Sequence, residues 1–187
     1  MTSQKPKTII IIGHFGVGKT TVAMRLCEKF APNVCVADLD IVNPFFRTSD
    51  YAERLKKMGA RLIAPEFAGS SLEVSTLSGE IDGAIGGYDG TLILDTGGNP
   101  DGAAVLGRYK ERLCNRGYIC LYVVNRFRPE SMTAEAAAGV LKEIEQACGI
   151  EATHVFDNTH LMGQEFKPDE NYLKKIIKLT KLSEYEI

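Results

Sequence analysis

Short apolar runs recur along the whole chain, and segments with a helical spacing of apolar residues separate them. The runs cover residues 8–12, 34–38, 61–64, 91–95, 118–125 and 153–156. Several runs are apolar without strict alternation, which is typical of strands that are covered on both faces. This βα alternation predicts an α/β fold, in which a mostly parallel sheet carries helices on both faces.

The segments between the runs hold apolar residues at intervals of three and four, as amphipathic helices do. This spacing predicts helices over residues 22–30, 50–58, 102–116, 132–144 and 170–180, and a weaker, glycine-interrupted one over 76–87. Parallel sheets bind ligands at the carboxyl ends of their strands. We therefore expect functional residues directly after each apolar run.

The bulk properties of the chain narrow its class. Its 187 residues suit one domain spanning 1–187, with a polar tail at 1–7. Twenty-two basic and 24 acidic residues give a net charge of -2, which provides no electrostatic basis for binding nucleic acid or an anionic membrane. No signal peptide or membrane-spanning run is recognisable, so we expect a cytoplasmic protein whose scattered cysteines are reduced.

A glycine-rich stretch follows the first apolar run and precedes the first helical segment. It reads G-H-F-G-V-G-K-T-T and contains the Walker A pattern G-x-x-x-x-G-K-T. Its glycines allow a nest of backbone N–H groups around phosphate oxygens, next to a helix N-terminus. The sequence therefore predicts nucleotide binding at Gly13, His14, Phe15, Gly16, Val17, Gly18, Lys19, Thr20 and Thr21.

Two carboxylates lie at the end of the run 34–38 and directly after it. Asp38 and Asp40 have the same parity along the strand, which predicts that both face the phosphate loop. Carboxylates beside a triphosphate hold Mg²⁺ through water or orient an attacking water. We therefore name Asp38 and Asp40, with Lys19, as the candidate catalytic residues. A solvated start of a loop is the alternative interpretation.

A third carboxylate, Asp95, ends the run 91–95 as the acidic residue of a Walker B strand does. Gly98 follows closely, and a glycine there lets a backbone N–H approach the γ-phosphate. The predicted metal ligands are Thr20, Asp40 and Asp95, with Mg²⁺ as the ion.

The order of these motifs resembles the MinD/ParA/nitrogenase-iron-protein group of P-loop NTPases, also known as CobQ/CobB/MinD/ParA nucleotide-binding domains. The matching stretches are 13–21, 38–40, 95–98 and 123–126. The resemblance implies the three-layer P-loop NTPase fold, with ATP and Mg²⁺ bound and ATP slowly hydrolysed. It also implies that Thr21 contacts the α-phosphate, Asp40 positions the attacking water and Asn125 contacts the adenine. The stretch Asn158-Thr159-His160 is a second candidate for the base pocket, with an ordinary turn as the alternative.

The phosphate loop departs from the pattern of that group. MinD and ParA proteins carry a second loop lysine that reaches the partner's nucleotide in a dimer, and here His14 stands in its place, followed by Phe15. The resemblance implies a nucleotide-dependent homodimer, and the alternative is an unknown protein partner. Either would use the loops 41–48 and 96–102, the first of which holds the adjacent aromatic residues Phe45 and Phe46.

Three functions are consistent with these motifs. The first is an ATP-driven switch with low ATPase activity. The second is an ATP-dependent ligase or kinase of small molecules, similar to dethiobiotin synthetase. The third is a GTP-dependent metallochaperone, which would require the guanine motif N-K-x-D. The stretch 125–128 supplies only its asparagine and has Arg128 in place of the aspartate, so the sequence favours ATP.

Overall fold

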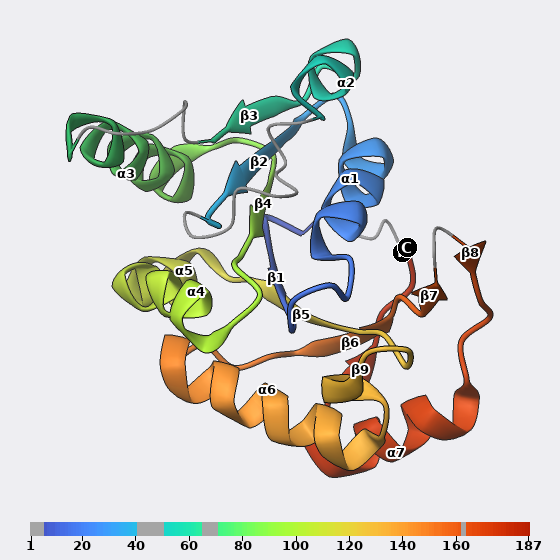
Figure 1. Cartoon of the computed structure of the whole chain (residues 1–187). Helices are drawn as coiled ribbons and strands as arrows, with labels where there is room; N and C mark the ends of the chain where they lie inside the picture. Colours follow the sequence, from blue (N-terminus) through green and yellow to red (C-terminus); the bar gives the residue numbers. More distant parts are fainter. Residues whose placement is uncertain (1–5, 41–50, 65–70, 162–163) are drawn as a thin grey trace.

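A parallel sheet organises the computed structural model, which describes residues 6–40, 51–64, 71–161 and 164–187 (Figure 1). Its strands stand in the order β3-β2-β4-β1-β5-β6-β9, and every neighbouring pair is parallel. The strands are β1 (Thr8–Ile12), β2 (Val34–Asp38), β3 (Arg61–Ile63), β4 (Thr91–Asp95), β5 (Ile119–Val124), β6 (His154–Asp157) and β9 (Ser183–Glu184). A separate antiparallel pair consists of β7 (His160–Leu161) and β8 (Gln164–Glu165).

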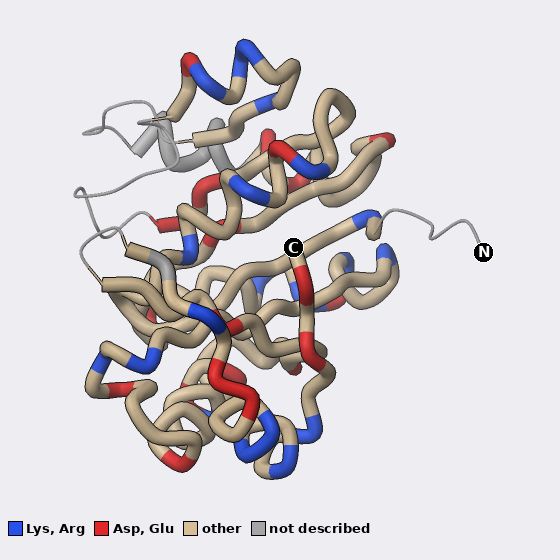
Figure 2. Tube along the Cα trace, turned by 90° about the vertical axis from the view of Figure 1, so that its right-hand side faces the viewer, with Lys and Arg blue, Asp and Glu red and all other residues tan. Residues whose placement is uncertain are grey.

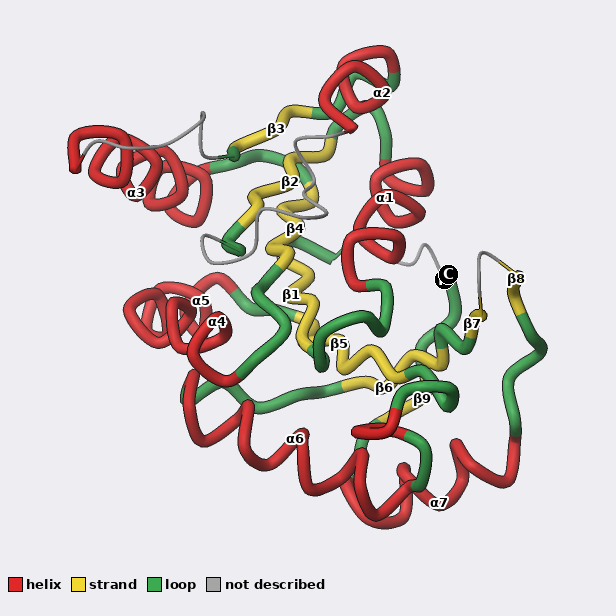
Figure 3. Tube along the Cα trace, viewed as in Figure 1, coloured by secondary structure: helices red, strands yellow, loops and turns green. Residues whose placement is uncertain are grey.

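The central strand β1 lies between two layers of helices, as Figure 3 shows. All five of its residues are buried. Ile10 and Ile12 belong to one apolar cluster, and Ile9 and Ile11 belong to the other. Because successive side chains of a strand point to opposite faces, the uninterrupted run of isoleucines fills both layers. The predicted three-layer α/β architecture is confirmed.

Two helices cover one face of the sheet, and the others cover the opposite face. The clusters place α1 (Lys19–Phe30) and α2 (Ala52–Lys57) on the first face. On the second face lie α3 (Ser71–Gly87), α4 (Pro100–Ala104), α5 (Lys110–Arg116), α6 (Ala134–Cys148) and α7 (Glu170–Thr180), together with the 3-10 segment η2 (Val105–Tyr109). A second 3-10 segment, η3 (Pro129–Ser131), precedes α6.

The prediction of one continuous helix over 102–116 is wrong. The structure divides this stretch into α4, η2 and α5. Gly102 and Gly107 weaken a continuous helix, and both are closely packed: a Cβ on Gly102 would lie 2.8 Å from Gly97 Cα and one on Gly107 would lie 3.3 Å from the Cys148 carbonyl oxygen. By contrast, α3 is longer than predicted, because it begins at Ser71 and the predicted segment was 76–87.

The sheet brings the ends of β1, β2, β4, β5 and β6 to one edge of the molecule, because these strands are parallel neighbours. Within the described ranges, no helix combines the length and the apolar character that a membrane span requires. Lysine and arginine are interspersed with aspartate and glutamate along the trace in Figure 2.

Candidate phosphate-binding site

The glycine-rich stretch forms the loop between β1 and α1. Gly16 and Gly18 have φ values of 76° and 87°, a left-handed conformation that is costly for any other residue here. Gly18 is also the N-cap of α1. The loop therefore ends on a helix N-terminus whose first N–H groups have no partner within the helix, which is the geometry that binds phosphate.

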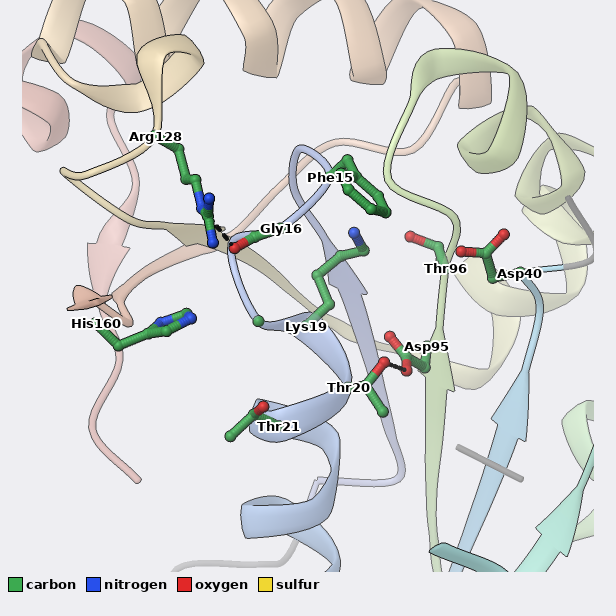
Figure 4. A pocket seen from close by; sticks show the side chains of 11 residues that line it. Phe15, Gly16, Lys19, Thr20, Thr21, Asp40, Asp95, Thr96, Arg128 and His160 are labelled. Atoms are coloured by element: carbon green, nitrogen blue, oxygen red, sulfur yellow. Dashed lines mark hydrogen bonds between the residues drawn. The ribbon is translucent and has the colours of Figure 1, made fainter. Parts of the chain in front are cut away.

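Lys19 is the first residue of α1, and its side chain folds back across the loop (Figure 4). Its Nζ donates to the His14 carbonyl oxygen at 3.3 Å, and only 8% of the residue is exposed. Burial lowers the pKa of Lys19, while the negative charges of Asp95 and Asp40 oppose this shift. A bound anion would stabilise the ammonium form of this buried amine.

Thr20 and Asp95 face each other across the gap between α1 and β4. The Thr20 hydroxyl donates to Asp95 Oδ2 at 2.7 Å, and Asp95 is buried at the end of β4. The next residue, Thr96, donates through its hydroxyl to the Ile11 carbonyl oxygen at 2.8 Å. Hydroxyl and carboxylate oxygens are the hard ligands that Mg²⁺ prefers, so this pair fits the predicted metal site.

The two carboxylates at the end of β2 differ in their surroundings. Asp40 lines the cavity beside Lys19 and Asp95. Asp38 is buried and is not among the lining residues, and its Oδ1 accepts a hydrogen bond from the Asp40 backbone N–H at 3.0 Å. Of the predicted pair, Asp40 therefore lies in the cavity, whereas Asp38 stabilises the turn next to it.

The two candidate asparagines also differ. Asn158 donates to the Val17 carbonyl oxygen at 2.8 Å and so contacts the phosphate loop directly. Asn125 is fully buried, where it accepts from the Phe127 N–H at 3.0 Å and donates to the His160 carbonyl oxygen at 3.1 Å. Neither lines the cavity. Asn125 supports His160, whose ring does line it.

These groups enclose a cavity of about 350 Å³, and Figure 4 shows that its lining side chains converge from several elements. The lining residues are Phe15, Gly16, Gly18, Lys19, Thr20, Thr21, Asp40, Asp95, Thr96, Arg128 and His160. Thr96 and Arg128 were not among the predicted site residues, whereas His160 lies in the stretch 158–160 that was predicted for the base pocket. The sequence signal for Thr96 and Arg128 was indirect, because each lies just beyond the end of a strand that neighbours β1.

The other predicted residues support the loop from outside the lining. Gly13 and Val17 are part of the phosphate loop. His14 Nδ1 is 3.5 Å from Glu130 Oε2. Gly98 packs behind Lys19, because a Cβ there would be 3.0 Å from Lys19 Nζ. The loop 41–48 lies outside the described residues. In the loop 96–102, the Asn99 side chain accepts from the Gly102 N–H at 2.7 Å and caps α4.

Comparison with known proteins supports the fold. No protein-family model matches the sequence, and no curated protein matches it. Among solved structures, the cell division protein FtsY from Thermotoga maritima matches with a TM-score of 0.60 and 18% identity, covering 83% of this chain and 53% of that one. The 54 kDa signal recognition particle protein from Aeropyrum pernix K1, in complex with GDP, gives 0.61 and 16%, covering 98% and 41%.

The hydrogenase maturation factor HypB from Archaeoglobus fulgidus is also similar, with a TM-score of 0.55 and 15% identity over 97% of this chain and 81% of that one. This chain spans about half the length of the FtsY and signal recognition particle proteins. Identities this low bear on the fold alone. The chain has a P-loop NTPase fold, and the closer resemblance to MinD and ParA stays a prediction.

Proposed function

We propose that this chain is a nucleotide-dependent switch that binds a nucleoside triphosphate with Mg²⁺ and hydrolyses it slowly. The observation that carries this proposal is the buried Lys19, whose amine lies inside a glycine loop and near two carboxylates in one cavity. Burying an amine costs free energy that burying an apolar side chain does not. A phosphate bound in the glycine loop would compensate for this cost by pairing with the ammonium group of Lys19.

The residues of the cavity suggest a division of roles. Backbone N–H groups of the loop and of the first turn of α1 would bind the phosphates, with Lys19 on the β- and γ-phosphate oxygens. Thr20 and Asp95 would hold Mg²⁺, which neutralises charge on the phosphates when bound. Among the described residues no group of three His, Cys, Asp or Glu side chains forms a metal site by itself, so phosphate oxygens and water would complete the shell.

Asp40 is the candidate residue for the attacking water. It lies in the cavity across from Lys19 (Figure 4), where its carboxylate would accept a hydrogen bond from that water. Water then attacks the γ-phosphorus, the bond to the β–γ bridging oxygen breaks, and the diphosphate leaves with the electron pair. Gly98 packs against both Phe15 and Lys19, so the loop 96–102 would respond to the loss of the γ-phosphate.

For the base, we propose adenine first and guanine as the second candidate. The guanine motif needs Lys-x-Asp after its asparagine, and Asn125 is followed by Arg-Phe-Arg and Asn158 by Thr-His-Leu. The similar signal recognition particle protein from Aeropyrum pernix K1 is a complex with GDP, which supports guanine instead. Direct competition between ATP and GTP for the wild-type protein decides between them.

Titration of the wild-type protein with Mg-ATP and Mg-GTP tests the proposal. We expect saturable binding of at least one nucleotide and slow release of phosphate. Lys19→Ala should weaken binding at least about tenfold, because it removes a charge-assisted contact. Lys142→Ala is the matched control, since Lys142 is exposed on α6. Absence of binding to the wild-type protein would refute the proposed function.

A further inference from the structure

Arg128 reaches the phosphate loop from the turn that follows β5. The backbone N–H of Arg128 donates to the Asn125 carbonyl oxygen at 2.9 Å, which closes the turn. Its side-chain Nε donates to the Gly16 carbonyl oxygen at 3.0 Å, and the guanidinium lies against Gly16, as Figure 4 shows. A cationic side chain 112 positions away in the sequence is therefore fixed on the loop.

The guanidinium has donors to spare. The arginine side chain carries five N–H donors, and within the described part of the chain only the Nε–H of the Arg128 guanidinium has a hydrogen-bond partner. No carboxylate of the described residues forms an ion pair with it. Four other arginines of the described ranges each contact a carboxylate: Arg54 with Glu28, Arg61 with Glu80, Arg112 with Asp82 and Arg126 with Asp169. Arg128 is instead directed at a cavity.

Resting on the function proposed above, we propose that Arg128 contacts the phosphates of the bound nucleotide and stabilises the charge that develops during hydrolysis. Its terminal nitrogens lie on the Gly16 side of the cavity, away from Asp40 and Asp95 (Figure 4). The phosphates would lie between this cation and Lys19 on one side and the metal-binding oxygens on the other. Charge leaving on the diphosphate would meet a fixed, always protonated donor.

This arrangement also bears on the histidine in the phosphate loop. His14 is half-buried, its Nδ1 lies 3.5 Å from Glu130 Oε2, and it does not line the cavity. Arg128 supplies a second cation to the same loop from within one chain. Hydrolysis would then not depend on a residue of a second protomer.

A purely structural role makes a different prediction. In that case Arg128 only holds the Gly16 carbonyl, and any side chain that donates a hydrogen bond there would replace it. Glutamine retains a donor and lacks the charge, whereas lysine retains the charge without the planar fork. The two substitutions therefore separate the two roles.

The experiment compares Arg128→Gln, Arg128→Ala and Arg128→Lys with the wild-type protein, and uses Arg112→Gln on the exposed face as the matched control. Phosphate release from Mg-ATP and Mg-GTP, binding of the diphosphates and the thermal midpoint are measured for each. We expect Arg128→Gln and Arg128→Ala to lower kcat at least about tenfold, while Arg128→Lys recovers part of it. Arg128→Gln, which retains a donor for the Gly16 carbonyl, should keep the wild-type midpoint.

The opposite pattern overturns the proposal. It is wrong if Arg128→Gln hydrolyses like the wild-type protein, or if the loss of activity only follows a loss of thermal stability. Failure of the proposed function gives another result, because then the wild-type protein and Arg112→Gln would bind neither nucleotide, and both proposals would be rejected together.

Discussion

Replacing Gly18 by alanine tests whether the phosphate loop has the described geometry before any nucleotide is added. Gly18 has a φ of 87°, and the left-handed conformation costs an L-residue roughly 1–2 kcal/mol. A Cβ at this position would also collide with Asn158 Nδ2 and lie 3.0 Å from His160 Cε1. The Asn158 amide would have to leave the Val17 carbonyl oxygen, losing a hydrogen bond worth about 1 kcal/mol.

The two contributions add to about 2–3 kcal/mol of lost unfolding free energy, which for a domain of this size lowers the thermal midpoint by roughly 4–12 °C. Gly139→Ala is the matched control. Gly139 is exposed within α6, and a Cβ added there would meet no other atom within 4 Å, so alanine at this position should stabilise the protein by about 0.5–1 kcal/mol.

Thermal and urea unfolding of the nucleotide-free proteins measure both effects. The reasoning is refuted if Gly18→Ala unfolds at the wild-type midpoint, or if both alanine variants shift in the same direction. A stable Gly18→Ala protein would mean that the loop is held differently from the description above, and the inferred phosphate cradle would lose its basis.

Four further predictions concern other parts of the molecule. Thr20→Val should destabilise the metal-free protein by about 1–3 kcal/mol in urea unfolding, because Asp95 Oδ2 loses its hydroxyl donor in a buried site; unchanged stability would contradict this. Thiol labelling of the native protein should modify Cys114 first, since it is exposed and the other four cysteines are buried; simultaneous labelling of all five would contradict the packing. Burial raises the pKa of Cys27 from 9.0 to about 12, so the thiol loses its proton at a lower pH in the unfolded chain than in the folded one. The free energy of unfolding should therefore fall as the pH rises from about 9 towards 12, and unfolding midpoints across this range would measure the fall. Light scattering with a non-hydrolysable ATP analogue should detect the nucleotide-dependent homodimer, and a monomer at all nucleotide concentrations would exclude it.

Local sequence signals were sufficient to predict the strand β1, the glycine-rich loop after it and the start of α1. The isoleucine run of β1, the glycines after it and Lys19 and Thr20 lie next to one another in the chain, so one motif predicts the loop and the helix together. Asp95 was predictable because it ends a buried strand. These features depend on neighbours in sequence, and pattern analysis is reliable for them.

Features that depend on distant contacts were not predictable in the same way. Arg128 reaches the cavity only because β5 is a neighbour of β1 in the sheet order. The two-residue strands β7, β8 and β9 are too short to show a period. The segment between α4 and α5 includes Gly107, which packs against Cys148, and Gly102 within α4 packs against Gly97; no spacing within 102–116 reveals these contacts.

The position of β1 in the centre of the sheet has a consequence for the synthesis of the protein. Although β1 leaves the ribosome before the other strands, its two hydrogen-bonded neighbours are β4 and β5, and Asn158 holds the phosphate loop from 141 positions downstream. Chains are made from the N-terminus at about 5–20 residues per second, so the Walker motif lacks this support until Asn158 has been synthesised. A nascent or truncated chain that ends before Asn158 would contain the entire motif without this support of the loop, and nucleotide binding would report that synthesis has passed Asn158.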